Sequence, residues 1–263
     1  MMNINWQFEQ VEVTSSTNTD LLDRLRLGEI TQPISRMALV QTSGKGRRGR
    51  KWISEPRRSL TFSLAYPFNH PDGIKHLSGL SLACGMALIH GLSRFYGVSD
   101  ATLFDKGLRL KWPNDVLINN GKVAGVLIEG SQNSKNGVAW MVIGIGINLY
   151  PLEKIDADYR SSSLDELIPL PLNHTNEDLW RGLSASLWEN CCHFNIHGFK
   201  DLKESWNKWH AFQGKVVEIK ENSQTQVRGT CIGVTENGAL MIDTDSGIQT
   251  IYSGDVSLRL MNE

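Results

Sequence analysis

The chain has 263 residues, of which 40% are hydrophobic and 21% charged, and its formal net charge at pH 7 is −1. This length can bury a full core, and a nearly balanced charge argues against nucleic-acid binding as the primary function. Residues 1–13 lack the basic and apolar parts of a secretion signal, and the longest uncharged run, residues 76–93, contains Gly, Ser and His, so we expect neither secretion nor a membrane span.

The four cysteines lack the C-x-x-C spacing of zinc sites, and two of them are adjacent. They are Cys84, Cys191, Cys192 and Cys231. We expect reduced, buried thiols and a cytoplasmic location, and we assign the cysteines no chemistry.

The chain begins with a predicted strand at residues 11–13, which leads through Thr14-Ser15-Ser16-Thr17-Asn18 into a helix. Ser16 or Thr17 is a natural helix cap, and capping alone would explain hydroxyl residues at this place. Five consecutive small polar residues exceed what one cap requires. The residues by themselves therefore leave both a cap and a ligand site open.

A basic loop, residues 41–52, follows a predicted buried strand end at residues 38–40 and holds five cations and three glycines. Gly44, Gly46 and Gly49 fit the dinucleotide pattern G-x-G-x-x-G, but no helical period follows them. A nucleic-acid patch lacks any second basic cluster, and a solvated loop gives no reason for the interleaved glycines and tryptophan. We therefore favour an anion-binding catalytic loop whose glycines let backbone N–H groups approach oxygens.

Residues 60–66 alternate with period two and predict a half-buried strand that Pro67 ends. The next segment, residues 76–95, predicts a helix with one apolar face. Two apolar runs, residues 108–118 and 123–129, flank Asn120-Gly121, a hairpin signal.

Lys111 lies at the end of one of these apolar runs, just before Trp112-Pro113. One interpretation is a gatekeeper on an edge strand. The other is a point charge aimed at a carboxylate or a phosphate.

Residues 138–149 predict another strand, and Gly144 and Gly146 within it indicate that a ligand or a backbone passes close by. Asn148 at its end could offer a purine both a donor and an acceptor. From residue 175 the pattern is helical. Short predicted strands follow, with turns between them, and suggest a small second domain: residues 215–220, 225–234, 239–243, 248–252 and 256–260.

In combination, these motifs resemble those of the biotin protein ligases over nearly the whole chain. The residues that carry the resemblance are Ser16-Thr17-Asn18, Gln41, Gly44 to Trp52, Lys111-Trp112-Pro113-Asn114-Asp115, Lys122 to Glu129, Gly144 to Asn148 and Gly254 to Arg259. Lys45 departs from the arginine of many relatives, and Arg57-Arg58 from a stretch that is often rich in glycine.

The resemblance implies an α+β fold: a mixed-sheet catalytic domain of the class II aminoacyl-tRNA synthetase and biotin ligase type at residues 1–212, then an SH3-like barrel at residues 213–263. It implies that ATP with Mg²⁺ activates biotin as biotinyl-5′-AMP. The biotinyl group then passes to a lysine ε-amine on the biotin carboxyl carrier domain of acetyl-CoA carboxylase or another biotin-dependent carboxylase.

The resemblance also assigns site residues, with Lys111 and Arg47 as the catalytic pair. The implied biotin-binding residues are Ser16, Thr17, Asn18, Gln41, Lys45, Gly46, Arg47, Lys111 and Gly125. The implied ATP-binding residues are Arg47, Arg50, Trp52, Lys111 and Asn148. No residue is assigned to a metal.

Two alternatives stay open beside this hypothesis. A lipoate–protein ligase has a similar fold, but it would need an apolar pocket in place of Ser16, Thr17 and Gln41. A non-catalytic adaptor would have no use for Lys111 and the basic loop. We expect a short form without an amino-terminal winged helix and without specific DNA binding, and we leave a homodimer open.

Overall fold

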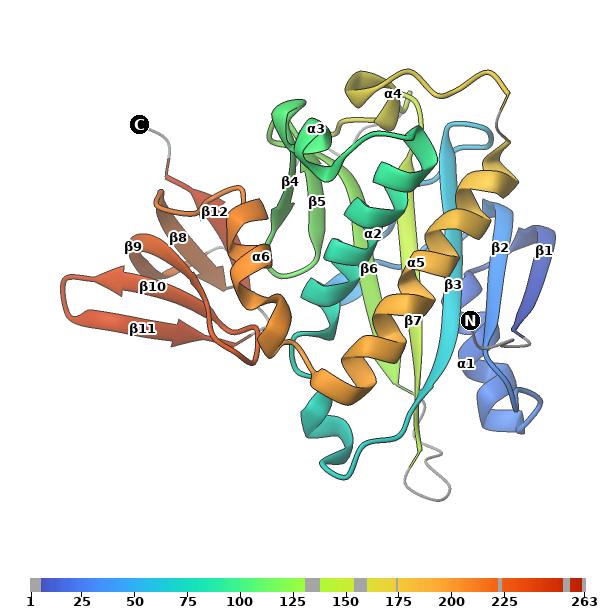
Figure 1. Cartoon of the computed structure of the whole chain (residues 1–263), viewed down its shortest axis with the longest axis horizontal. Coiled ribbons are helices and arrows are strands. Elements are labelled where there is room, and N and C mark those ends of the chain that lie inside the picture. Colours follow the sequence, from blue (N-terminus) through green and yellow to red (C-terminus); the bar gives the residue numbers. More distant parts are fainter. Residues whose placement is uncertain are drawn as a thin grey trace.

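The computed structural model describes residues 6–130, 138–153, 160–173, 175–221, 224–252 and 256–261. Within these residues, seven strands form one mixed sheet in the order β1-β2-β3-β7-β6-β5-β4, and five strands form an antiparallel sheet in the order β11-β10-β9-β8-β12. The second sheet lies at one side of the first (Figure 1). The α+β fold with a mixed sheet and a small carboxy-terminal β domain is confirmed; the boundary between residues 212 and 213 stays a prediction.

The first sheet contains β1 (Gln7–Thr14), β2 (Ile34–Gln41), β3 (Ser59–Phe68), β4 (Leu108–Lys111), β5 (Asp115–Ile118), β6 (Gly121–Gly130) and β7 (Ala139–Asn148). The helices are α1 (Thr17–Leu27), α2 (Leu80–Tyr96), α3 (Asp100–Asp105), α4 (Leu164–Leu167), α5 (Asn176–His197) and α6 (Lys203–Trp209). The second sheet contains β8 (Val216–Glu221), β9 (Gln224–Val234), β10 (Leu240–Thr244), β11 (Gly247–Ile251) and β12 (Val256–Leu260). Only β1 and β2 pair in parallel within the first sheet.

Helices α2 and α5 cover one face of the first sheet, and α1 lies on the other (Figure 1). The largest buried apolar cluster runs from this sheet and its helices into the second sheet, where it includes Val217 and Leu258. The two sheets therefore share one core. Within the described part of the chain, no helix is both long and apolar enough to cross a membrane.

Strand β3 differs from its prediction in burial and in length. All but one of its side chains are buried, and Pro67 pairs with Trp140 inside the strand. Proline lacks the N–H that a second neighbour would need, but pairing with β2 stops at Ala65. The prediction that Pro67 ends the strand was therefore wrong, because beyond Ala65 the strand has only β7 as a partner.

The predicted hairpin is present, with its turn one residue earlier than expected. Asn119 and Asn120 have positive φ angles of 47° and 67°, and Ile118 pairs with Gly121 across the turn. Asparagine tolerates this conformation better than most residues. Gly121 is instead the first residue of β6, where a Cβ atom would collide with the Ser162 hydroxyl.

The helix expected over residues 76–95 is shorter at its amino end. Residues 73–77 form a separate 3₁₀ turn, and α2 begins only after Gly79, whose φ is +84°. A Cβ atom at Gly79 would meet the Phe199 ring at 2.7 Å, so glycine allows both the break and the close packing.

The second sheet is attached to the first through the bend that follows β4. Trp112 is buried there and its Nε1–H donates to the Gly238 carbonyl at 3.0 Å. The Ala211 N–H donates to the Leu110 carbonyl at 2.8 Å. These contacts hold the second sheet against the end of β4, next to Lys111.

The turn at Gly238 gives a test of this attachment. A Cβ atom there would lie 2.8 Å from the Gly79 Cα, and φ is +73°. Gly247 also has a positive φ, +103°, but a Cβ atom added there would meet nothing within 4 Å. We predict that Gly238→Ala lowers the free energy of unfolding by clearly more than Gly247→Ala, whose cost should be about 1 kcal/mol. Urea denaturation of both variants measures this; equal losses would show that the contact with Gly79 adds nothing.

Candidate active site

One cavity of about 350 Å³ lies where the first sheet, the basic loop and β12 meet. Ligand sites commonly have volumes of roughly 300–1,000 Å³. Eleven of the twelve predicted site residues line it, namely Ser16, Thr17, Asn18, Gln41, Lys45, Gly46, Arg47, Arg50, Trp52, Lys111 and Gly125. Asn148 is the residue that does not.

The basic loop closes on itself as a small hairpin. The Gly46 N–H donates to the Arg50 carbonyl at 2.7 Å, and the Trp52 N–H donates to the Gly44 carbonyl at 2.9 Å. A Cβ atom at Gly44 would lie 2.6 Å from the Trp52 carbonyl oxygen. In this structure these two glycines close the loop, and the Gly46 N–H is not available to a ligand as the sequence suggested.

The glycines of β7 accommodate side chains of this chain. A Cβ atom at Gly146 would collide with the Trp52 indole, and one at Gly144 would collide with the Asn18 amide. A Cβ atom at Gly125 of β6 would lie 3.3 Å from the same indole. The close approach that these glycines predicted is therefore made by Trp52 and Asn18, which contact the sheet and form part of the cavity wall.

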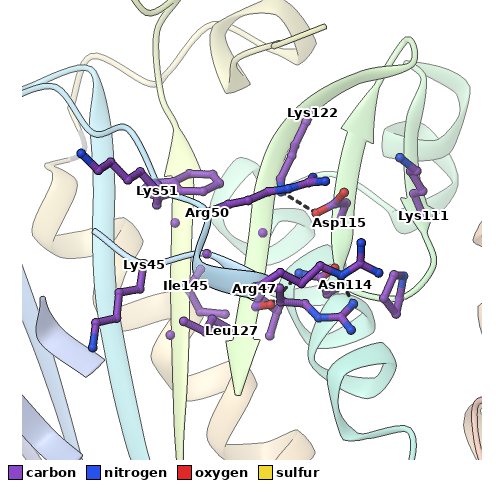
Figure 2. Close-up of a pocket in the computed structure, with 18 of the residues that line it drawn as sticks. Lys45, Arg47, Arg50, Lys51, Lys111, Asn114, Asp115, Lys122, Leu127 and Ile145 are labelled. Carbon is purple, nitrogen blue, oxygen red and sulfur yellow. Dashed lines mark hydrogen bonds and ion pairs between the residues drawn. The ribbon is translucent and has the colours of Figure 1, made fainter. Parts of the chain in front are cut away.

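Positive charge dominates the cavity. Among the described lining residues, nine are cationic, namely Lys45, Arg47, Arg48, Arg50, Lys51, Lys111, Lys122, Arg160 and Arg259. The described lining includes one carboxylate, Asp115, and it forms an ion pair with Lys122 at 2.6 Å. Lys45 and Lys51 point away from Lys111 and Arg47 (Figure 2). Such an excess of cations favours a polyanionic ligand.

Lys111 ends β4, which is the edge strand of the first sheet. Its half-buried side chain nevertheless lines the cavity, which argues against a gatekeeper exposed on the edge. The pKa of its amine is lowered to about 8: burial is the largest cause, Asp115 opposes it, and the nearby cations Arg259, Lys122 and Arg50 contribute to the lowering. A poorly solvated amine of this kind gains most when an anion arrives.

Arg47 reaches from the basic loop to the bend after β4. Its Nη1 donates to the Asn114 Oδ1 at 3.4 Å, and the Asn114 amide nitrogen donates to the Val126 carbonyl at 2.8 Å. Asn114 thus connects the loop to β6. The two predicted catalytic residues, Arg47 and Lys111, both line the cavity, and Figure 2 shows Arg47 beside Asn114.

A chain of polar contacts forms the other wall of the cavity. The Thr17 N–H donates to the Gln41 Oε1 at 2.8 Å, and the Thr17 and Ser63 hydroxyls are 2.6 Å apart. Ser63 donates to the Asn18 Oδ1 at 2.6 Å, and the Asn18 amide nitrogen donates to the Glu129 Oε2 at 2.8 Å. Thr17, Asn18 and Ser63 are all buried. Ser16 is the amino-terminal cap residue of α1 but its side chain makes no capping hydrogen bond, so the polar segment does more than cap a helix.

Asn148 is buried beneath a backbone segment outside the cavity. Its amide nitrogen donates to the Lys122 carbonyl, the Ser161 hydroxyl and the Ser162 carbonyl at 3.0 to 3.3 Å. Its Oδ1 has no partner among the described residues. The amide nitrogen is therefore committed to the protein, and the adenine contact stays a prediction.

Several residues that line the cavity were not predicted from the sequence to belong to the site. They are Ser63, Asn114, Asp115, Lys122, Arg160, Phe212 and Arg259. Arg259 belongs to β12 of the second sheet, and the motif that ends in it was the only signal for it. Gly254 and Asp255 of that motif lie outside the described residues. Arg58 contacts the Pro151 carbonyl and Glu153 and does not line the cavity.

Known protein families match both parts of the chain. The model of the Biotin/lipoate A/B protein ligase family matches residues 10–148, and that of the Biotin protein ligase C terminal domain matches residues 213–259. The biotin–(acetyl-CoA-carboxylase) ligase of Mycobacterium tuberculosis is 30% identical over 254 residues, which are 95% of this chain and 88% of that protein. The chain belongs to the biotin protein ligase family.

Other members of the biotin protein ligase family resemble it over similar lengths. The bifunctional ligase/repressor BirA of Escherichia coli is 30% identical over 248 residues, covering 94% of this chain and 72% of that protein. The solved structure of the biotin protein ligase from Aquifex aeolicus in complex with biotin and ATP has a TM-score of 0.75 and 27% identity, covering 99% of this chain and 100% of that one.

The depressed pKa of Lys111 predicts a pH dependence. The amine carries its charge below about pH 8 and loses it as the pH rises through that value. Catalysis that needs this cation should have a kcat/KM, for formation of an acyl adenylate, that falls above about pH 8. In Lys111→Arg, whose guanidinium stays charged, the residual activity should not fall there. A common decline in both enzymes would assign the titration to another group.

Proposed function

We propose that this chain is an ATP-dependent biotin protein ligase that forms biotinyl-5′-AMP and transfers the biotinyl group to a lysine ε-amine on a carrier domain. One observation carries the proposal: a single cavity combines a buried wall of neutral hydrogen-bonding groups around Thr17 with a strongly cationic region around Lys111. Biotin has a neutral ureido ring at one end and a carboxylate at the other, so it matches both regions.

The neutral wall offers one acceptor and one donor. Ser63 gives its hydrogen to Asn18, so the Thr17 hydroxyl donates across its 2.6 Å contact with Ser63 in preference to its longer, 3.2 Å contact with the Gln41 Oε1, and its lone pairs remain for a ligand N–H. The Gln41 Oε1 is occupied by the Thr17 N–H, which leaves the Gln41 amide nitrogen as a donor for a carbonyl oxygen. A ureido group carries both an N–H and a C=O.

The same wall argues against lipoate as the acyl substrate. A dithiolane ring has neither an N–H nor a carbonyl oxygen, so it would cover the buried Thr17 hydroxyl and the half-buried Gln41 amide without pairing with them. Each unpaired group would cost about 1–3 kcal/mol. Biotin binding is therefore favoured over lipoate binding by this chain's own residues.

Activation takes place at the cationic region. A biotin carboxylate oxygen attacks the α-phosphorus of ATP, a new P–O bond forms, and the bond to pyrophosphate breaks with its electron pair leaving on pyrophosphate. In this proposal the two anions meet beside Lys111, which lines the cavity, so that its charge offsets their repulsion and the charge that develops at phosphorus. Arg47, Arg50 and Arg259 surround the same space and suit the remaining phosphates.

Transfer uses the mixed anhydride as an acyl donor. The carrier lysine amine attacks the acyl carbon, an amide bond forms, AMP leaves with the electrons of the C–O bond, and the amine proton is released. Relatives named as ligases of acetyl-CoA carboxylase support a carboxylase carrier domain as the acceptor. Cytoplasmic location and the lack of specific DNA binding stay predictions, and a homodimer stays open.

The described lining of the cavity fits Mg²⁺ that arrives with ATP better than a metal held by the protein. Mg²⁺ in nucleotide sites usually keeps waters and substrate phosphates as ligands, with one or two carboxylates. The described cavity lining offers Asp115 alone, paired with Lys122. When bound, the ion would neutralise phosphate charge, with Asp115 as the one described carboxylate that could assist.

Pyrophosphate exchange into ATP tests the proposal. We predict exchange that depends on biotin and not on lipoate or octanoate. Lys111→Ala should lower it at least about a hundredfold while the fold is retained, because charge stabilisation made mainly in the transition state is lost. Lys75→Ala, which removes an exposed lysine outside the cavity, is the matched control. Exchange supported by lipoate and not by biotin would overturn the proposed substrate.

A further inference from the structure

Glu129 lies on β6 and is not among the residues that line the cavity. Its carboxylate nevertheless ends the polar chain that runs from Gln41 through Thr17, Ser63 and Asn18. We propose that Glu129 is a positioning residue that fixes, through Asn18 and Ser63, which hydrogen-bonding groups Thr17 presents to the ureido ring. This inference rests on the proposed biotin ligase function.

The direction of each hydrogen bond follows from Glu129. A carboxylate only accepts hydrogen bonds, so the group of Asn18 that faces it at 2.8 Å must be the NH₂. The Asn18 oxygen then faces Ser63, which must donate to it at 2.6 Å. Ser63 has only one hydrogen, so Thr17 must donate to Ser63. One obligate acceptor therefore sets the orientation of three side chains.

The surroundings of Asn18 leave it few other arrangements. Asn18 is 3% exposed and Ser63 is 0% exposed, so water does not compete for the contact between them. The Asn18 amide lies directly over Gly144, where any Cβ atom would collide with it. The amide can turn over by exchanging its oxygen and nitrogen, but it has no room to leave. A hydrogen-bond acceptor at position 129 therefore determines which of the two orientations the Asn18 amide adopts.

Without that acceptor, the opposite orientation becomes available. The Asn18 NH₂ could then donate to Ser63, and Ser63 would donate to Thr17. The Thr17 hydroxyl would have one lone pair occupied, and its hydrogen would have to find another acceptor, such as Gln41 Oε1 at 3.2 Å. A biotin N–H would meet a hydroxyl that is partly occupied and no longer held in one orientation.

Two neutral substitutions of similar size separate this role from a general effect of charge or packing. Glu129→Gln keeps an oxygen that can accept from Asn18, and Glu129→Met keeps the length but has no oxygen. We expect the biotin Kd of Glu129→Gln to stay within about threefold of the parent and that of Glu129→Met to rise about tenfold. The KM for ATP and the kcat of exchange should stay within about twofold.

Two further variants complete the experiment. Ser63→Ala removes the link between Asn18 and Thr17, so Glu129→Met should weaken biotin binding no further in that background. Glu12 is an exposed residue on β1 outside the cavity. Glu12→Met makes the same charge change as Glu129→Met and should leave the biotin Kd unchanged. Isothermal titration with biotin and exchange kinetics are measured on full-length chains, with circular dichroism as the check on folding.

Equal increases of the biotin Kd in Glu129→Gln and Glu129→Met would overturn the inference. Additive increases of the biotin Kd when Glu129→Met and Ser63→Ala are combined would also overturn it. Should Glu129→Met not fold, Ser63→Ala alone carries the test: an unchanged biotin Kd would refute the polar chain, and an increase with an unchanged KM for ATP would support it. A parent chain that binds no biotin would instead refute the proposed function, so the two failures are distinguishable.

Discussion

Repulsion among like charges is the constraint on which this site depends. The described part of the cavity gathers nine cationic residues around one carboxylate, and the Lys111 amine is half-buried among them. Its pKa is lowered to about 8, mainly by burial, and the neighbouring cations contribute to this against the opposing effect of Asp115. The rest of the fold is what holds these charges together, and an anionic ligand is what relieves their repulsion. A site built in this way is complementary to the charge of reacting phosphate and carboxylate groups.

Both sheets contribute residues to this site. The first sheet supplies Lys111 at the end of an edge strand, and β12 of the second sheet supplies Arg259. The contact of Trp112 with Gly238 and that of Ala211 with Leu110 hold the sheets together beside that strand end. The second sheet therefore contributes to the lining of the cavity, and its attachment to α2 and β4 holds that part of the lining in place.

Most of the elements and the polar and charged motifs could be predicted from sequence because they depend on local patterns. Apolar periodicity predicted the strands and helices. Lys111 and the basic loop were predicted as site residues because their charges directly follow apolar strands. Features that depend on contacts between distant parts of the chain could not be predicted in this way. Pro67 continues β3 only because β2 stops pairing at Ala65. Gly144 and Gly146 accommodate Asn18 and Trp52, which are distant in sequence. Ser63 looked like one polar position of an alternating strand, and only the fold places it between Thr17 and Asn18.

A crystal structure with biotin and a non-hydrolysable ATP analogue tests the central claim most directly. The account predicts that the ureido ring lies against Thr17 and Gln41, and that the biotin carboxylate and the α-phosphate both lie within hydrogen-bonding distance of the Lys111 amine. Biotin bound with its carboxylate at Thr17, or an α-phosphate bound away from Lys111, would contradict it.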